Sequence, residues 1–195
     1  MRAKLWLSVC VCHAVASMLV WWMGERLPDW LIWRADHWLD RPWTLWTSAW
    51  VHMNTQHLIS NQLAVGALAA MAWVLKPGLR ASAAWLAAWP LVPLVLPLWP
   101  HVGYYAGLSG LIHAAVAVVG VYLLAGRSAV PVARRWGLML LAGLLAKLLY
   151  ERSWQWPVVW SDGLGISVVQ SAHLIGAVGG ALLMGLLLHR ALDQH

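Results

Sequence analysis

Residues 107–125 read GLSGLIHAAVAVVGVYLLA, a run of nineteen residues without Asp, Glu, Lys or Arg. A helix needs about 20 mostly apolar residues to cross the hydrocarbon core of a bilayer, and this run has that length. The whole chain of 195 residues is 62% hydrophobic and 10% charged, whereas soluble domains carry about 25% charged residues. The composition excludes an ordinary soluble globular protein, a disordered chain and a nucleic-acid-binding domain. It predicts an all-α, polytopic membrane protein.

Five other segments of the chain are also long and apolar enough to span a membrane. The six predicted spans, all within one domain covering residues 1–195, are 5–23, 56–75, 81–99, 107–125, 134–150 and 167–188. Residues 24–55 form a long Trp-rich connection that is too polar to span. Because Trp prefers the headgroup level of a membrane, we expect this connection to lie in the outer interface as short amphipathic pieces.

The loops between these spans differ in charge. The two termini and loops 76–80 and 126–135 together hold eight basic residues and one acidic residue, and the loops on the other side hold five basic and six acidic residues. Basic residues concentrate on the cytoplasmic side of membrane proteins. The asymmetry therefore predicts that both termini are cytoplasmic, which is consistent with an even number of spans.

Polar residues open three of the spans. His57 and Asn61 are four residues apart and share one face of the second span. Ser109 opens the fourth span, and His173 lies near the start of the sixth. All three spans run from outside to inside, so these side chains lie at similar depth near the outer face. A serine, a histidine and hydrogen-bond donors at one depth are the parts of a hydrolytic site.

The chemistry of such a site assigns a role to each of these groups. His173 can take the hydroxyl proton of Ser109 and make it a nucleophile. His57, Asn61 and the free backbone amide at the start of the Ser109 helix can donate to the oxyanion that then forms. His113 lies one turn after Ser109, so we expect it to line the same site.

Small residues predict that the fourth and sixth spans come close together. Gly110 and Ala114 on one span can face Gly176 and Gly180 on the other, and glycines four residues apart let helix backbones approach closely in membranes. Close approach is what a short serine side chain needs to reach an imidazole on a neighbouring helix.

Other intramembrane chemistries fit the sequence less well. It contains no His-Glu-x-x-His motif, which a zinc protease requires. An aspartyl protease needs two intramembrane carboxylates, and the nearest candidates, Glu151 and Asp162, lie in a predicted outer loop. Lys147 and Glu151 are four residues apart at a helix end and are most simply interpreted as a snorkelling ion pair. A small transporter is also disfavoured, because the spans show no inverted repeat.

Three motifs together resemble the rhomboid intramembrane serine proteases. They are His52-x4-His57-x3-Asn61, Gly107-x-Ser109-Gly110 and Ala172-His173-x2-Gly176-x3-Gly180. The resemblance covers about residues 40–188. It implies a six-helix fold, a Ser109–His173 dyad without metal or cofactor, and an oxyanion hole from His57, Asn61 and the Ser109 amide. It also matches His52 to a family histidine near the oxyanion site.

The sequence departs from the family at two positions. Trp43-Thr44 stands where the family often has Trp-Arg, and His113 replaces the aromatic residue that commonly packs on the catalytic histidine. The short loops and the segment Ala146-Lys147-Leu148-Leu149-Tyr150-Glu151 are similar to the bacterial rhombosortase subfamily.

That subfamily resemblance implies a multi-pass protein of the bacterial inner membrane whose site opens to the periplasm. Its expected substrates are membrane-anchored proteins with a C-terminal Gly-Gly motif, an apolar helix and a basic tail. The alternatives are a general rhomboid protease of other transmembrane substrates and a proteolytically inactive relative that binds membrane helices.

Overall fold

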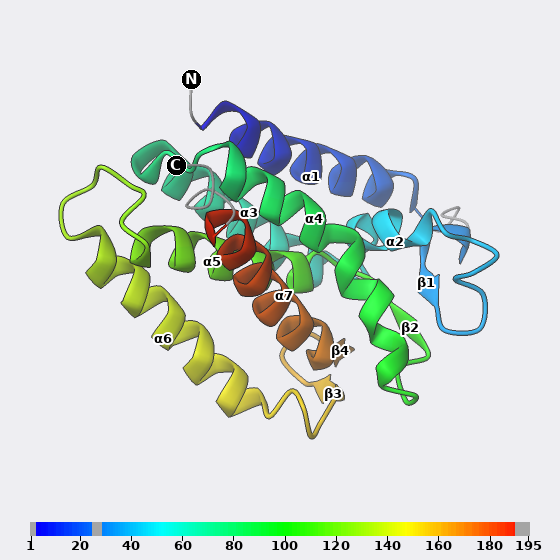
Figure 1. Cartoon of the computed structure of the whole chain (residues 1–195). Coiled ribbons are helices and arrows are strands. Elements are labelled where there is room, and N and C mark those ends of the chain that lie inside the picture. The colour runs from blue at the N-terminus through cyan, green and yellow to red at the C-terminus, as the bar shows by residue number, and fades with distance from the viewer. Residues whose placement is uncertain (1–2, 25–28, 190–195) are drawn as a thin grey trace.

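The computed structural model describes residues 3–24 and 29–189, which are mostly helical, as the composition predicts (Figure 1). Long apolar runs form the helices because a helix satisfies every backbone polar group within its own segment. The helices are α1 (Lys4–Trp22), α2 (Thr44–Thr47), α3 (Thr55–Leu75), α4 (Leu79–Val95), α5 (Ser109–Leu124), α6 (Ala133–Glu151) and α7 (Gln170–His189).

Helix α5 lies at the centre of the bundle. Eleven of its sixteen residues are buried, and it packs against α7, α6, α4 and α3. Helix α1 packs on α3 and α4, whereas α6 lies at the edge of the bundle and packs mainly on α5 (Figure 1). A Cβ atom at Gly137 of α6 would lie 2.7 Å from the Gly120 carbonyl oxygen of α5, so glycine allows this close contact.

Four helical segments in the described part of the chain are long and apolar enough to cross a membrane. They are Lys4–Trp22, Thr55–Leu75, Leu79–Leu98 and Gln170–His189. The predicted spans 107–125 and 134–150 do not meet this criterion of length and apolar composition. With sixteen residues, α5 is about 24 Å long at 1.5 Å per residue, and α6 carries Arg134, Arg135, Lys147 and Glu151. The fold is a membrane-type helical bundle, and six crossings stay a prediction.

Two small antiparallel sheets lie outside the long helices. Strand β1 (Trp33–Arg34) pairs with β2 (Tyr104–Tyr105), and β3 (Val158–Ser161) forms a hairpin with β4 (Ile166–Val169). The sequence prediction placed the starts of two spans too early. Residues 107–108 are a loop before α5, and residues 167–169 belong to β4. The second difference arises because a short apolar run suits a strand as well as a helix.

The connection predicted for residues 24–55 consists of short elements in the part that the structure describes. These are a 3₁₀ turn at Asp29–Leu31, β1, α2 and a second 3₁₀ turn at Ser48–Trp50. Five charged residues of the loop comparison lie outside the described residues, namely Arg2, Glu25, Arg26, Arg190 and Asp193.

Candidate active site

The centre of the candidate site is a hydrogen bond between two helices. Ser109 is the first residue of α5 and His173 the fourth residue of α7. The Ser109 Oγ lies 3.0 Å from the His173 Nε2, a good distance for the hydroxyl to donate to the ring nitrogen. The structure therefore brings together the two residues that the sequence predicts as nucleophile and base, although they are 64 positions apart.

Glycines allow α5 and α7 to come this close. A Cβ atom at Gly110 would lie 2.9 Å from the Ala172 carbonyl oxygen, and one at Gly180 would lie 2.5 Å from the Ala114 carbonyl oxygen. A Cβ atom at Gly176 would collide with the Gly110 backbone. The predicted contact between the small residues of the two helices is confirmed.

The loop before Ser109 is held by backbone groups and a buried tyrosine. The Gly107 amide donates to the Ser48 carbonyl oxygen over 2.9 Å, and the Tyr105 hydroxyl donates to the Gly107 carbonyl oxygen over 2.8 Å. Gly107 has φ +116°, and a Cβ atom there would lie 2.6 Å from the His57 Cε1. Only glycine fits both this conformation and this space, which explains its place two residues before the serine.

The same glycine is next to the predicted oxyanion donors. His57 and Asn61 are buried on the first two turns of α3, and the position of a Cβ atom at Gly107 is 3.7 Å from the Asn61 Nδ2. Within the described residues, the Asn61 Nδ2 and the His57 Nδ1 are buried without a hydrogen-bond partner. Buried polar groups are normally paired, so the Asn61 amide, and the His57 Nδ1 in the tautomer that protonates it, are suited to donate to a transient charge.

His52 packs against this donor pair. Its ring lies edge-on to the ring of His57, with 4.9 Å between centroids, and its Nδ1 donates to the Trp50 carbonyl oxygen over 3.1 Å. Burial, with a smaller contribution from the charge of His57, lowers the pKa of His52 to about 4. His52 is therefore neutral at pH 7 and supports the position of His57.

Glu151 is a site residue that the sequence analysis missed. The predicted ion pair with Lys147 is present, with 2.6 Å between the Lys147 Nζ and the Glu151 Oε1. The same carboxylate also faces His173, because its two oxygens lie 3.1 and 3.0 Å from the His173 Nδ1. The available signal was the position of Glu151 at the outer end of a predicted span, close to the depth predicted for His173.

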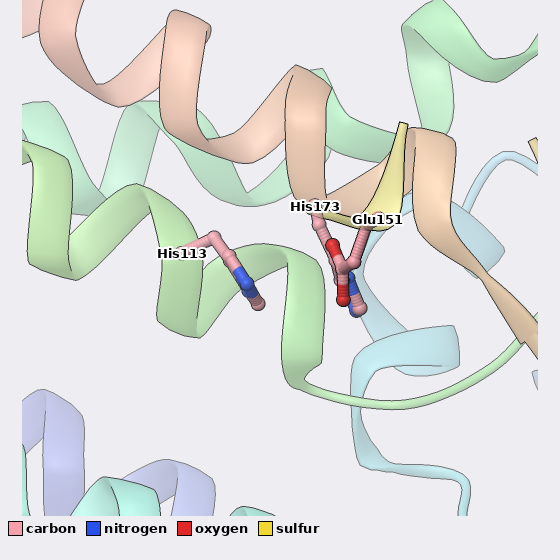
Figure 2. A group of neighbouring side chains, drawn as sticks. All are labelled: His113, Glu151 and His173. Atoms are coloured by element: carbon pink, nitrogen blue, oxygen red, sulfur yellow. The ribbon is translucent and has the colours of Figure 1, made fainter. Parts of the chain in front are cut away.

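His113 lies where the sequence predicts. Its ring stacks on that of His173, with 4.1 Å between centroids and 9° between planes, and its Nδ1 donates to the Ser109 carbonyl oxygen over 2.7 Å. His113, Glu151 and His173 come from three separate helices, α5, α6 and α7, and Figure 2 shows their side chains.

The metal-ligating nitrogen and oxygen atoms of these three residues lie close enough together to hold a metal ion. Their geometry fits an ion poorly. The lone pairs of parallel stacked rings cannot converge on one centre, and both nitrogens of His173 already have partners. The contacts of these three side chains fit a hydrogen-bonded cluster better.

A cavity of about 550 Å³ adjoins Ser109 and His173. Its walls come from α3, α5, α6 and the β3–β4 hairpin, with mostly apolar side chains such as Ile112, Val116 and Leu144. The hairpin is tied to the start of α3, because the Asn54 Nδ2 donates to the Leu164 carbonyl oxygen over 2.6 Å. An apolar cavity beside a serine–histidine pair can bind an extended, uncharged segment of chain.

Comparison with known proteins finds no family model and no curated protein that matches this chain. A serine bonded to an imidazole, with free donors nearby, is suited to acyl transfer through a covalent intermediate.

Proposed function

We propose that this protein is an intramembrane serine endopeptidase that cleaves membrane-anchored proteins near the outer face of the membrane. The observation that carries the proposal is the 3.0 Å hydrogen bond between the Ser109 Oγ and the His173 Nε2. The apolar cavity beside it and the two unpartnered donors on α3 add to its support. Serine bonded to histidine is the arrangement by which enzymes make a hydroxyl nucleophilic.

The reaction starts with attack of the Ser109 Oγ on the carbonyl carbon of the scissile bond, while His173 accepts the hydroxyl proton at Nε2. Asn61, His57 and the Ser109 amide donate to the oxyanion. When the carbon–nitrogen bond breaks, His173 gives its proton to the leaving amine and an acyl-enzyme remains. A water molecule, or another nucleophile, then attacks the acyl carbon and gives up its proton to His173. The bond between the acyl carbon and the Ser109 Oγ breaks, and His173 returns the proton to the Oγ.

The topology that we propose has six crossings with both termini in the cytoplasm. Helix α5 is buried among its neighbours and need not match the bilayer alone, and the charges of α6 lie near its two ends. Arg134 and Arg135 are then on the cytoplasmic side, and Glu151 is on the outer side with the site. The membrane would be a bacterial inner membrane, with the site open to the periplasm.

We further propose that the chain is a rhomboid protease of the rhombosortase type. The support is the motif resemblance, together with the placement of His57, Asn61, Gly107, Ser109 and His173 around one cavity or at its edge. A helical substrate must unwind before its peptide bond can be attacked, and glycine costs a helix up to about 1 kcal/mol per residue relative to alanine. A Gly-Gly motif beside an apolar helix is therefore a suitable cleavage point.

The test uses purified protein in detergent and in vesicles. Ser109→Ala and His173→Ala should abolish both fluorophosphonate labelling and cleavage of a Gly-Gly-tailed membrane substrate. Ser161→Ala, in β3 and outside the cavity lining, should leave both unchanged. Undiminished cleavage by Ser109→Ala would refute the proposal.

Other outcomes separate the alternatives. Cleavage only of membrane substrates without a Gly-Gly tail would indicate a general rhomboid protease. Binding of membrane helices by wild-type protein that neither labels nor cleaves would indicate an inactive relative.

A further inference from the structure

The Glu151 carboxylate is largely shielded from solvent and faces the base. Its side chain is 9% exposed and that of His173 is 6% exposed. Both carboxylate oxygens are within 3.1 Å of the His173 Nδ1, so this nitrogen must carry a proton to make the contact. The Nδ1 proton leaves the lone pair of Nε2 directed at the Ser109 Oγ, which is the tautomer that a general base needs.

Lys147 contacts the same carboxylate from another direction. Its Nζ is 2.6 Å from the Glu151 Oε1, and an ammonium group can only donate. The Ser153 hydroxyl donates to the second oxygen, Oε2, over 3.3 Å. With donors on both oxygens, the carboxylate is held in one orientation toward the Nδ1.

We propose that Glu151 is a positioning residue for the catalytic base, and that Lys147 holds Glu151 in the orientation this needs. The proposal rests on the proposed protease function and adds to it an acid and a cation carried by α6. Glu151 keeps the Nδ1 proton in place and stays ionised throughout. When Ser109 loses its proton to Nε2, the positive charge on the ring of His173 is stabilised by the adjacent carboxylate.

Glu151→Gln tests the first part of the proposal. Glutamine offers one acceptor and one donor in place of two acceptors, and Lys147 competes for the acceptor because it can only donate. The amide N–H of the glutamine then faces the His173 Nδ1. It favours the tautomer that carries its proton on Nε2, which cannot accept the proton of Ser109. The loss should approach the drop of about 10⁴-fold in kcat that is seen when the acid of a serine triad is changed to its amide.

The readout is the rate at which a fluorophosphonate labels Ser109, together with kcat for a membrane substrate. The loss should appear in the labelling rate and in kcat, with KM nearly unchanged. Asp162→Asn is the matched control, because Asp162 is a carboxylate of the β3–β4 hairpin that accepts a hydrogen bond from the Trp160 Nε1. This control should label at the wild-type rate.

The double variant Glu151→Gln with Lys147→Met tests the second part. Without the ammonium group, the glutamine oxygen is free to accept from the Nδ1–H, so labelling should recover at least about tenfold over Glu151→Gln alone. A residue with only a structural role would not show this recovery, because the second substitution removes a further contact.

Each outcome separates the hypotheses. Labelling of Glu151→Gln within threefold of wild type overturns the role of Glu151, and a double variant no faster than Glu151→Gln overturns the role of Lys147. If Glu151→Gln does not fold, Glu151→Asp replaces it, because the shorter side chain withdraws the carboxylate by about 1.5 Å. The labelling rate of Glu151→Asp should be at least tenfold below that of wild type. A Glu151→Asp variant that labels at the wild-type rate overturns the proposal. Failure of the protease function itself is distinct, since wild-type protein would then label no faster than Ser109→Ala.

Discussion

Replacing Gly176 by alanine should separate the two halves of the proposed catalytic pair, Ser109 and His173, without changing either of them. The new Cβ atom would lie 2.9 Å from the Gly110 carbonyl carbon and closer still to its oxygen. Carbon atoms in contact normally lie 3.5–4.0 Å apart, so α7 must move away from α5 by at least about 0.6 Å. The distance between the Ser109 Oγ and the His173 Nε2, now 3.0 Å, would then exceed the hydrogen-bond range.

The expected effect on catalysis is large. A misplacement of about 1 Å can cost a factor of 10² in rate, so fluorophosphonate labelling of Ser109 and turnover should fall about 30- to 100-fold. Overpacking of a tight contact costs about 1–3 kcal/mol of stability, which thermal unfolding in detergent will measure.

Gly185→Ala provides the matched control on the same helix. A Cβ atom at Gly185 meets nothing within 4 Å, so this variant should label at the wild-type rate and unfold at the same or a higher temperature. If Gly176→Ala is folded and labels as fast as wild type, the close contact between α5 and α7 does not position the dyad, and the reasoning is refuted.

Three further predictions concern the groups around the dyad. Asn61→Ala should lower kcat by about 10²- to 10³-fold with little change in KM, because one oxyanion donor is lost; an unchanged kcat would contradict that role. Asn54→Ser keeps a side chain able to cap α3 but loses the bond to Leu164, so it should be more stable in thermal unfolding than Asn54→Ala by about 1 kcal/mol. Burial lowers the pKa of His52 to about 4, below the value near 6.5 of an unfolded chain. Above pH 6.5 His52 is neutral in both the folded and the unfolded chain, so it does not lower the free energy of unfolding. As the pH falls to 4 the unfolded chain binds the proton more readily, and the free energy of unfolding decreases by about 3 kcal/mol. His52→Gln should flatten this part of the curve of Tm against pH, and an unchanged curve would show that His52 is not the group responsible.

The amino-acid sequence alone predicted the helical membrane class and the pairing of Ser109 with His173. Both follow from local patterns. Apolar run length reports helices that can be buried in lipid, and polar residues at the start of parallel spans must lie at similar depth. The facing glycines were predictable for the same reason, since small residues four apart lie on one helix face.

Only the tertiary structure decided how α6 meets the site. Glu151 and His173 are 22 positions apart, on helices whose relative rotation and tilt no local pattern specifies. An ion pair between Lys147 and Glu151 was predictable because both residues share one helix, whereas the second partner of the carboxylate depends on how separate helices pack. The β3–β4 hairpin was missed for a related reason: short apolar segments take the form that their surroundings allow, and here Leu164 meets Asn54 from 110 positions away.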